Sequence, residues 1–129
     1  MSVKAGDAFS VPSGPEGNHL FVVVLPFTNF IGMQKQTTIL VSICSIVPKH
    51  DRTCELLPGD HPFITRPSYV AYSKARAYSE VDIQKHIASG FFSPKTAISA
   101  ELLVRIKNGL IASPRTQNYL KDLLHGVSD

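Results

Sequence analysis

The sequence is poor in the features that mark secreted and membrane proteins. It holds two cysteines, Cys44 and Cys54, which form no C-x-x-C pair and are too few for a disulfide framework. Its longest apolar run, LFVVVLPF, is far shorter than the roughly 20 residues that a bilayer span needs. The opening stretch MSVKAGDAFSVPSGPEG lacks the apolar core of a signal peptide. We therefore expect a cytoplasmic protein with reduced thiols and no membrane segment.

Strong charge of either sign is also missing. The 13 lysines and arginines against 10 aspartates and glutamates give a net charge of +3. This mild excess permits a phosphate-bearing partner, but without clustering it is no signature of nucleic-acid binding. The chain also lacks repeats and low-complexity tracts. Its 129 residues fit one domain that buries a core without disulfide or metal support.

What the sequence does contain is a change of period near residue 78. Before it, β-branched and aromatic segments separated by Pro and Gly predict five short strands, which indicate a small barrel or sandwich. The segment HLFVVVLPF is apolar almost throughout, which predicts a strand buried on both faces or a strand of a tightly curled barrel. The predicted strands cover residues 7–11, 19–27, 37–47, 52–57 and 68–78.

From Ser79 onward the apolar period is helical. Ser79 and Ser99 are predicted N-caps, and Ser113 followed by Pro114 is a third signal for a helix start. The segment FFSPKTA between the first two helices is predicted to be a connector. The helices predicted behind the three caps cover residues 80–89, 100–113 and 114–126. The predicted fold class is therefore α+β, with the helices packed on the β part as one domain.

Four motifs follow one another through residues 4–78. They are KAGDAFSV with the loop PSGPEGN behind it, HLFVVVLP, SICS, and LLPGDHPFITRPSYVAYSKAR. The first three resemble the G-D-h-h-x-V opening, the R-P-x-L-V-L-S strand and the P-I-T-S strand of the MazF/PemK/Kid family of toxin ribonucleases. The fourth resembles an outlying PemK-like subgroup with a G-[DE]-H-P-F-[IV] signature, and it is the most specific of the four.

The resemblance implies an SH3-like β-barrel of five to six strands in residues 1–78, followed by two to three helices in residues 79–129. It also implies a toxin of a toxin–antitoxin system, a metal-independent endoribonuclease that cuts single-stranded RNA without a cofactor. Family members act as homodimers and are blocked by an antitoxin protein. Their catalytic arginine and threonine fall here on His19 and on Cys44, with Ser45 next to it.

Cleavage of RNA through its 2′-hydroxyl needs a base, an acid, and cations that stabilise the charge on phosphorus. His19 and His61, each at a strand edge beside a Gly-containing loop, are the predicted base and acid. Cys44 and Ser45 complete the predicted catalytic set. Cationic side chains are expected to hold the phosphate, and tyrosines together with Phe63 to stack on bases. The predicted RNA-binding residues are Arg66, Lys49, Arg52, Tyr69 and Tyr72.

Other interpretations stay open. His61 before Pro62 also fits a rigid turn, and Cys44 in an apolar strand also fits a buried, inert thiol. Zinc suits the side chains of Cys44, Cys54, His50 and His61, but their spacing does not follow the usual pattern of structural zinc sites, so no metal is expected. A non-catalytic SH3-like module that binds nucleic acid or protein is the alternative function. A third possibility is that the helical tail covers the groove for an antitoxin helix or forms a dimer face.

Overall fold

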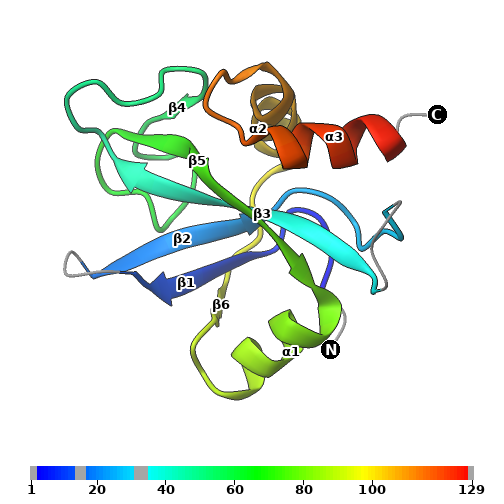
Figure 1. Ribbon diagram of the computed structural model, residues 1–129. Helices are drawn as coiled ribbons and strands as arrows, with labels where there is room; N and C mark the ends of the chain where they lie inside the picture. The colour runs from blue at the N-terminus through cyan, green and yellow to red at the C-terminus, as the bar shows by residue number, and fades with distance from the viewer. Residues whose placement is uncertain (1–2, 14–16, 31–34, 128–129) are drawn as a thin grey trace.

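The computed structural model describes residues 3–13, 17–30 and 35–127 and confirms the α+β class (Figure 1). One antiparallel sheet holds six strands in the order β4-β5-β3-β2-β1-β6, so β4 and β6 are its two open edges. The strands are β1 (Ala8–Pro12), β2 (Asn18–Val23), β3 (Thr37–Ser45), β4 (Glu55–Leu56), β5 (Ser68–Ser79) and β6 (Ser93–Lys95). The helices are α1 (Glu80–Ala88), α2 (Ala100–Ala112) and α3 (Asn118–Val127). Part of the PSGPEGN loop, residues 14–16, lies outside the described residues.

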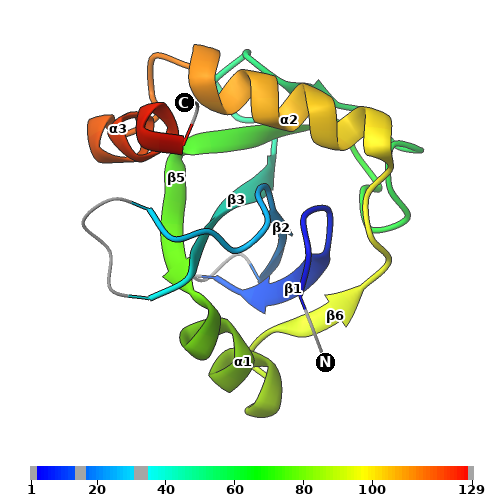
Figure 2. The ribbon, with the colours of Figure 1, turned by 90° about the vertical axis from the view of Figure 1, so that its right-hand side faces the viewer.

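The helices cover opposite sides of the sheet (Figures 1 and 2). Leu102, Ile106 and Leu110 of α2 join the larger of two buried apolar clusters, and Ile83 of α1 joins the smaller. The strand β2 contributes Leu20 and Val22 to the larger cluster and Val23 to the smaller one. The prediction of a strand buried on both faces is therefore confirmed for β2. None of the helices in the described ranges combines the length and apolar character that crossing a membrane requires.

The long strand β5 bends sharply in the middle. Its pairing with β3 jumps from Arg76 opposite Leu40 to Ala71 opposite Ser42, so residues 72–75 form a large bulge. Inside the bulge, the Tyr72 hydroxyl donates a 2.9 Å hydrogen bond to the carbonyl oxygen of Ile106 in α2. This bond fixes the bend against α2, and the next two residues, Ser73 and Lys74, are exposed.

Two of the three predicted helix starts are confirmed. The Ser79 hydroxyl accepts a hydrogen bond from the amide of Asp82, and the Ser99 hydroxyl accepts one from the amide of Leu102. The prediction that FFSPKTA is only a connector is wrong, because β6 lies within it and pairs with β1. A proline is compatible with β6 because this strand is an edge of the sheet.

The third predicted helix start is wrong. Ser113 is the C-cap of α2, its amide donates to the carbonyl of Gly109, and α3 begins only at Asn118. The Ser113 side chain instead donates a 2.6 Å hydrogen bond to Asp51, which lies in the loop before β4. The Ser113 oxygen also accepts a 3.1 Å hydrogen bond from the Arg115 amide, so the local contact of a capping serine forms without starting a helix at residue 114.

Candidate functional site

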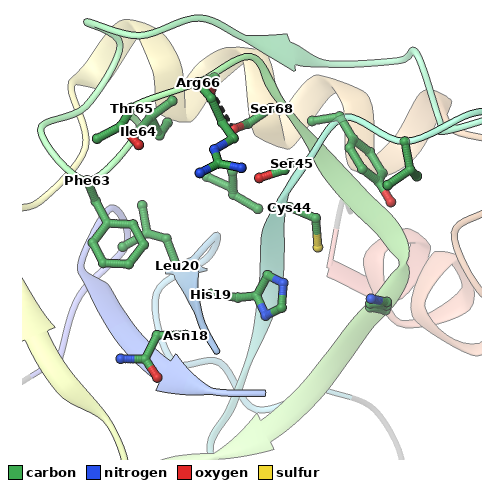
Figure 3. A pocket seen from close by; sticks show the side chains of 14 residues that line it. Asn18, His19, Leu20, Cys44, Ser45, Phe63, Ile64, Thr65, Arg66 and Ser68 are labelled. Carbon is green, nitrogen blue, oxygen red and sulfur yellow. Dashed lines mark hydrogen bonds between the residues drawn. The ribbon is translucent and has the colours of Figure 1, made fainter. Parts of the chain in front are cut away.

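A pocket of about 580 Å³ opens where the first residues of β2, the last residues of β3 and the start of β5 meet (Figure 3). Its volume lies within the usual range of ligand-binding pockets. The loop between β4 and β5, which belongs to the PGDHPFI motif, forms another wall. The described lining residues are Asn18, His19, Leu20, Ile43, Cys44, Ser45, Val47, Phe63, Ile64, Thr65, Arg66, Ser68, Tyr69 and Lys74.

Three of the predicted site residues form one row across neighbouring strands. Leu20 of β2 pairs with Ile43 of β3, so the antiparallel register sets His19 beside Cys44. Cys44 in turn pairs with Tyr69 of β5. Residues paired in this way project from the same face of a sheet. In Figure 3 the His19 ring and the Cys44 thiol point toward one another inside the pocket.

The His19 imidazole carries a nitrogen without a hydrogen-bond partner. Its Nδ1 atom is buried, and no described residue donates to it or accepts from it. Buried polar atoms without a hydrogen-bond partner are rare in folded proteins. His19 thus lines the pocket, while its solvent-shielded Nδ1 has no hydrogen-bond partner among the described residues.

The charged side chains of the pocket are cationic. Arg66 approaches from the β4–β5 loop and Lys74 from the bulge of β5, and none of the described lining residues is acidic. The Ser68 hydroxyl donates a 2.8 Å hydrogen bond to the Arg66 carbonyl and so holds this part of the loop. Figure 3 shows the Arg66 side chain directed toward Ser45 and the pocket interior. Two cations without a nearby carboxylate favour an anionic ligand.

Two aromatic rings border the same pocket. Phe63 comes from the β4–β5 loop, and Tyr69 stands at the start of β5. Burial, followed by the nearby Cys44 thiol, raises the pKa of Tyr69 above the ordinary value of a tyrosine. Its phenol therefore stays protonated at neutral pH and can both stack and donate a hydrogen bond. Sγ of Cys44 lies 3.6 Å from the hydroxyl of Ser42.

The structure does not bring His61 into this pocket, contrary to the expectation that it would face His19. His61 is buried, its Nε2–H donates a 2.6 Å hydrogen bond to the Thr96 carbonyl, and its Nδ1 accepts from the Phe63 amide. The ring thus ties the β4–β5 loop to the segment behind β6. Both ring nitrogens of His61 are therefore engaged within the chain.

Three of the predicted RNA-binding residues also lie elsewhere. Tyr72 is fully buried in the core, so its ring cannot stack on a base. Lys49 and Arg52 are exposed in the loop before β4 and do not line the pocket. Lys49 has a positive φ of 62°, and its carbonyl accepts a hydrogen bond from Arg115. Of the predicted set, the pocket gathers His19, Cys44, Ser45, Arg66 and Tyr69.

The zinc-type side chains considered from the sequence do not converge. His50 contacts Glu55 and the Val47 carbonyl, His61 contacts Thr96, and burial raises the pKa of the Cys54 thiol. Within the described ranges, no group of three or more His, Cys, Asp or Glu side chains is placed to hold a metal ion.

Lys74 is the main site residue that sequence reasoning missed. In the run SYVAYSKARAY, strict alternation predicts a flat strand, on which Lys74 carries no special meaning. The bulge at residues 72–75 turns this lysine toward the pocket. Apolar and polar residues stop alternating regularly around SKAR, and this irregularity is the sequence signal that could have indicated the bulge.

The fold and the pocket together define an α+β protein with a basic, partly aromatic cavity at one end of its sheet. No family model matches the sequence of this chain, and no curated protein matches it either.

Proposed function

We propose that this pocket binds single-stranded RNA and that the protein is a toxin-like endoribonuclease. The observation that carries the proposal is the placement of His19. The His19 ring, whose Nδ1 has no described partner, lines a pocket that also contains Arg66 and Lys74 and has no acidic side chain among its described lining residues. A titratable imidazole beside two cations suits proton transfer next to a phosphodiester.

The proposed reaction is transfer of the phosphoryl group to the neighbouring 2′-oxygen. His19 takes the proton of the 2′-hydroxyl, the O2′–P bond forms, and the P–O5′ bond breaks. Arg66 and Lys74 stabilise the negative charge that grows on the phosphoryl oxygens. The departing 5′-oxygen needs a proton, and the pocket offers the Lys74 ammonium and the Cys44 thiol as donors. Tyr69 and Phe63 hold the adjacent bases by stacking.

The sequence resemblance supports the same site. The positions that correspond to the arginine and threonine of the MazF/PemK/Kid family are His19 and Cys44, and both line the pocket from adjacent strands. We propose that the bent six-stranded sheet is a variant of the family's SH3-like barrel. A cytoplasmic location, a homodimer and an antitoxin partner belong to the same proposal.

A binding module without catalysis is the second candidate. The observation that favours it is the engagement of His61 with Thr96 and Phe63, which leaves His19 as the histidine among the described lining residues. Metal-independent cleavage by two histidines needs one as base and one as acid. The described lining residues supply His19 but no second histidine. A module of this kind would grip RNA through Arg66, Lys74 and Tyr69 and leave it intact.

Cleavage of a fluorescent single-stranded RNA in the presence of EDTA separates the two functions. We expect the wild-type protein to cut the RNA, and His19→Gln and His19→Asn to bind it but cut at least about 100-fold more slowly, the usual effect of losing a general base. The exposed His125 of α3 supplies the matched control, His125→Gln, which should cut at the wild-type rate. Binding without cleavage by the wild-type protein would establish the module instead.

A further inference from the structure

His50 is bonded in a way that suits a doubly protonated ring. Its Nδ1 lies 2.8 Å from the Val47 carbonyl oxygen, and its Nε2 lies 2.5 Å from Oε2 of Glu55. A carbonyl and a carboxylate are both hydrogen-bond acceptors, so both ring nitrogens must donate. His61 shows the contrasting pattern, because one of its nitrogens donates and the other accepts. The geometry of His50 is that of an imidazolium paired with a carboxylate.

The His50 ring contacts Tyr69, one of the residues that line the pocket. The His50 side chain is only 7% exposed, and its ring centroid is 5.0 Å from that of Tyr69 at an interplanar angle of 50°. Glu55 is also paired with Tyr69 across β4 and β5. Tyr69 lines the pocket, whereas His50 and Glu55, which contact it, are not among the described lining residues. A cation near an aromatic face is attracted to it.

Both acidic and basic side chains lie on the loop of His50 and on the elements bonded to it. Glu55 of β4 supplies the direct counter-charge, and Asp51 follows in the same loop, bonded to Thr53 and Ser113. On the cationic side, Arg105 of α2 donates to the Glu55 carbonyl, and Arg115 donates to the carbonyl of Lys49. The two arginines thus bond backbone oxygens, while the Glu55 carboxylate is bonded to His50.

We propose that His50 is a positioning residue that acts through Tyr69, so that the affinity of the pocket for RNA falls as His50 loses its proton. The inference rests on the proposed RNA site and adds a pH-dependent control to it. Deprotonation removes one of the two hydrogen bonds of the ring together with its charge, and the support for Tyr69 is lost. Affinity therefore declines when the pH is raised far enough to remove this proton.

The first test observes the ring protons of the free protein by ¹⁵N NMR, with His61 as the internal control. At about pH 6 we expect both nitrogens of His50 to carry protons, because both contact acceptors, and His61 to carry one, because its Nδ1 accepts from the Phe63 amide. The Tyr69 ring resonances should shift together with His50 when the pH is raised. A neutral His50 at about pH 6, or a Tyr69 ring that does not follow it, overturns the inference whether or not RNA binds.

The second test is a double-mutant cycle read by binding of a short fluorescent RNA. His50→Gln should weaken binding by about three- to tenfold in the wild-type background and have no further effect in a Tyr69→Ala background. Glu55→Gln, which keeps the shape of the side chain, should move the pH profile of binding toward lower pH. An equal loss from His50→Gln in both backgrounds overturns the positioning role. Absence of RNA binding by the wild-type protein overturns the proposed function, and the NMR result still decides the state of His50.

Discussion

The Ser113 hydroxyl donates a 2.6 Å hydrogen bond to Oδ2 of Asp51 and so joins the turn between α2 and α3 to the loop before β4. Oδ1 of the same carboxylate accepts hydrogen bonds from the amide and the hydroxyl of Thr53. Arg115 adds a 2.9 Å hydrogen bond to the Lys49 carbonyl. These hydrogen bonds anchor the C-terminal helices to the loop between β3 and β4, which carries His50.

This carboxylate makes stability depend on acid pH. Burial raises the pKa of Asp51, but hydrogen bonds from Ser113 and Thr53 and the charge of Arg115 outweigh it, so the net pKa lies below the ordinary value of 3.8. Its contribution to stability is complete above about pH 4 and is lost as the pH falls through the lowered pKa. We expect Ser113→Ala to cost roughly 1–3 kcal/mol at neutral pH and less in acid, measured by urea unfolding. A cost that is equal at both pH values would contradict this role of Asp51.

Gly109 is required because Tyr72 lies against it. A Cβ atom at this position would stand 2.0 Å from the Tyr72 hydroxyl oxygen and 2.7 Å from the ring carbon that carries it. Alanine normally stabilises a helix by about 1 kcal/mol relative to glycine, but crowding of a packed core costs roughly 1–3 kcal/mol or more. We therefore expect Gly109→Ala to lower the free energy of unfolding, whereas Asn108→Ala on the exposed side of α2 should not. In a Tyr72→Phe background the cost of Gly109→Ala should be smaller.

His61 and His19 should respond to substitution in opposite ways. His61→Gln removes the ring that bridges the β4–β5 loop and Thr96, so we expect a loss of roughly 1–3 kcal/mol of stability with RNA cleavage retained well below the melting temperature. His19→Gln should leave the melting temperature nearly unchanged and remove cleavage. Thermal unfolding and the RNA assay, run on both variants, check this contrast. If a folded His61→Gln protein does not cut RNA, His61 takes part in catalysis and this contrast is wrong.

The two pocket cations should each contribute to the salt dependence of RNA binding. Every phosphate contact to a single strand contributes about 0.7 to the slope of log affinity against log salt concentration. We expect Arg66→Gln and Lys74→Gln each to reduce the slope by about this amount and Lys107→Gln, an exposed substitution on α2, to leave it unchanged. Unchanged slopes for both pocket variants would place the RNA on another surface.

Local sequence signals predicted those elements whose contacts are local. The N-caps Ser79 and Ser99 bond amides three residues away, and the predicted helices behind them are confirmed. Ser113 has the same local pattern and accepts from the Arg115 amide, but its hydroxyl also donates to Asp51, a distant contact that no local rule reveals. The strand β6 was missed because three exposed residues with a proline have no apolar pattern, and only pairing with β1 makes them a strand.

The candidate site shows the same division. His19 and Cys44 meet because two apolar strands pair in a regular register, and such strands are readable from sequence. The sequence predicts similar roles for His61 and His19. The Nε2–H of His61, however, donates to the carbonyl of Thr96, which lies 35 residues further along the chain. Lys74 enters the pocket only through the bulge in β5, and bulges leave a weak trace in sequence.

The central claim, that RNA binds in the pocket around His19, is tested most directly by NMR titration of the labelled protein. The ligand is a short single-stranded RNA with 2′-O-methyl groups, which binds but cannot be cut through its 2′-oxygen. We predict chemical-shift changes concentrated at His19, Cys44, Arg66 and Tyr69, with the His61 ring unaffected. Changes confined to other surfaces, or none at all with saturating RNA, would contradict the account.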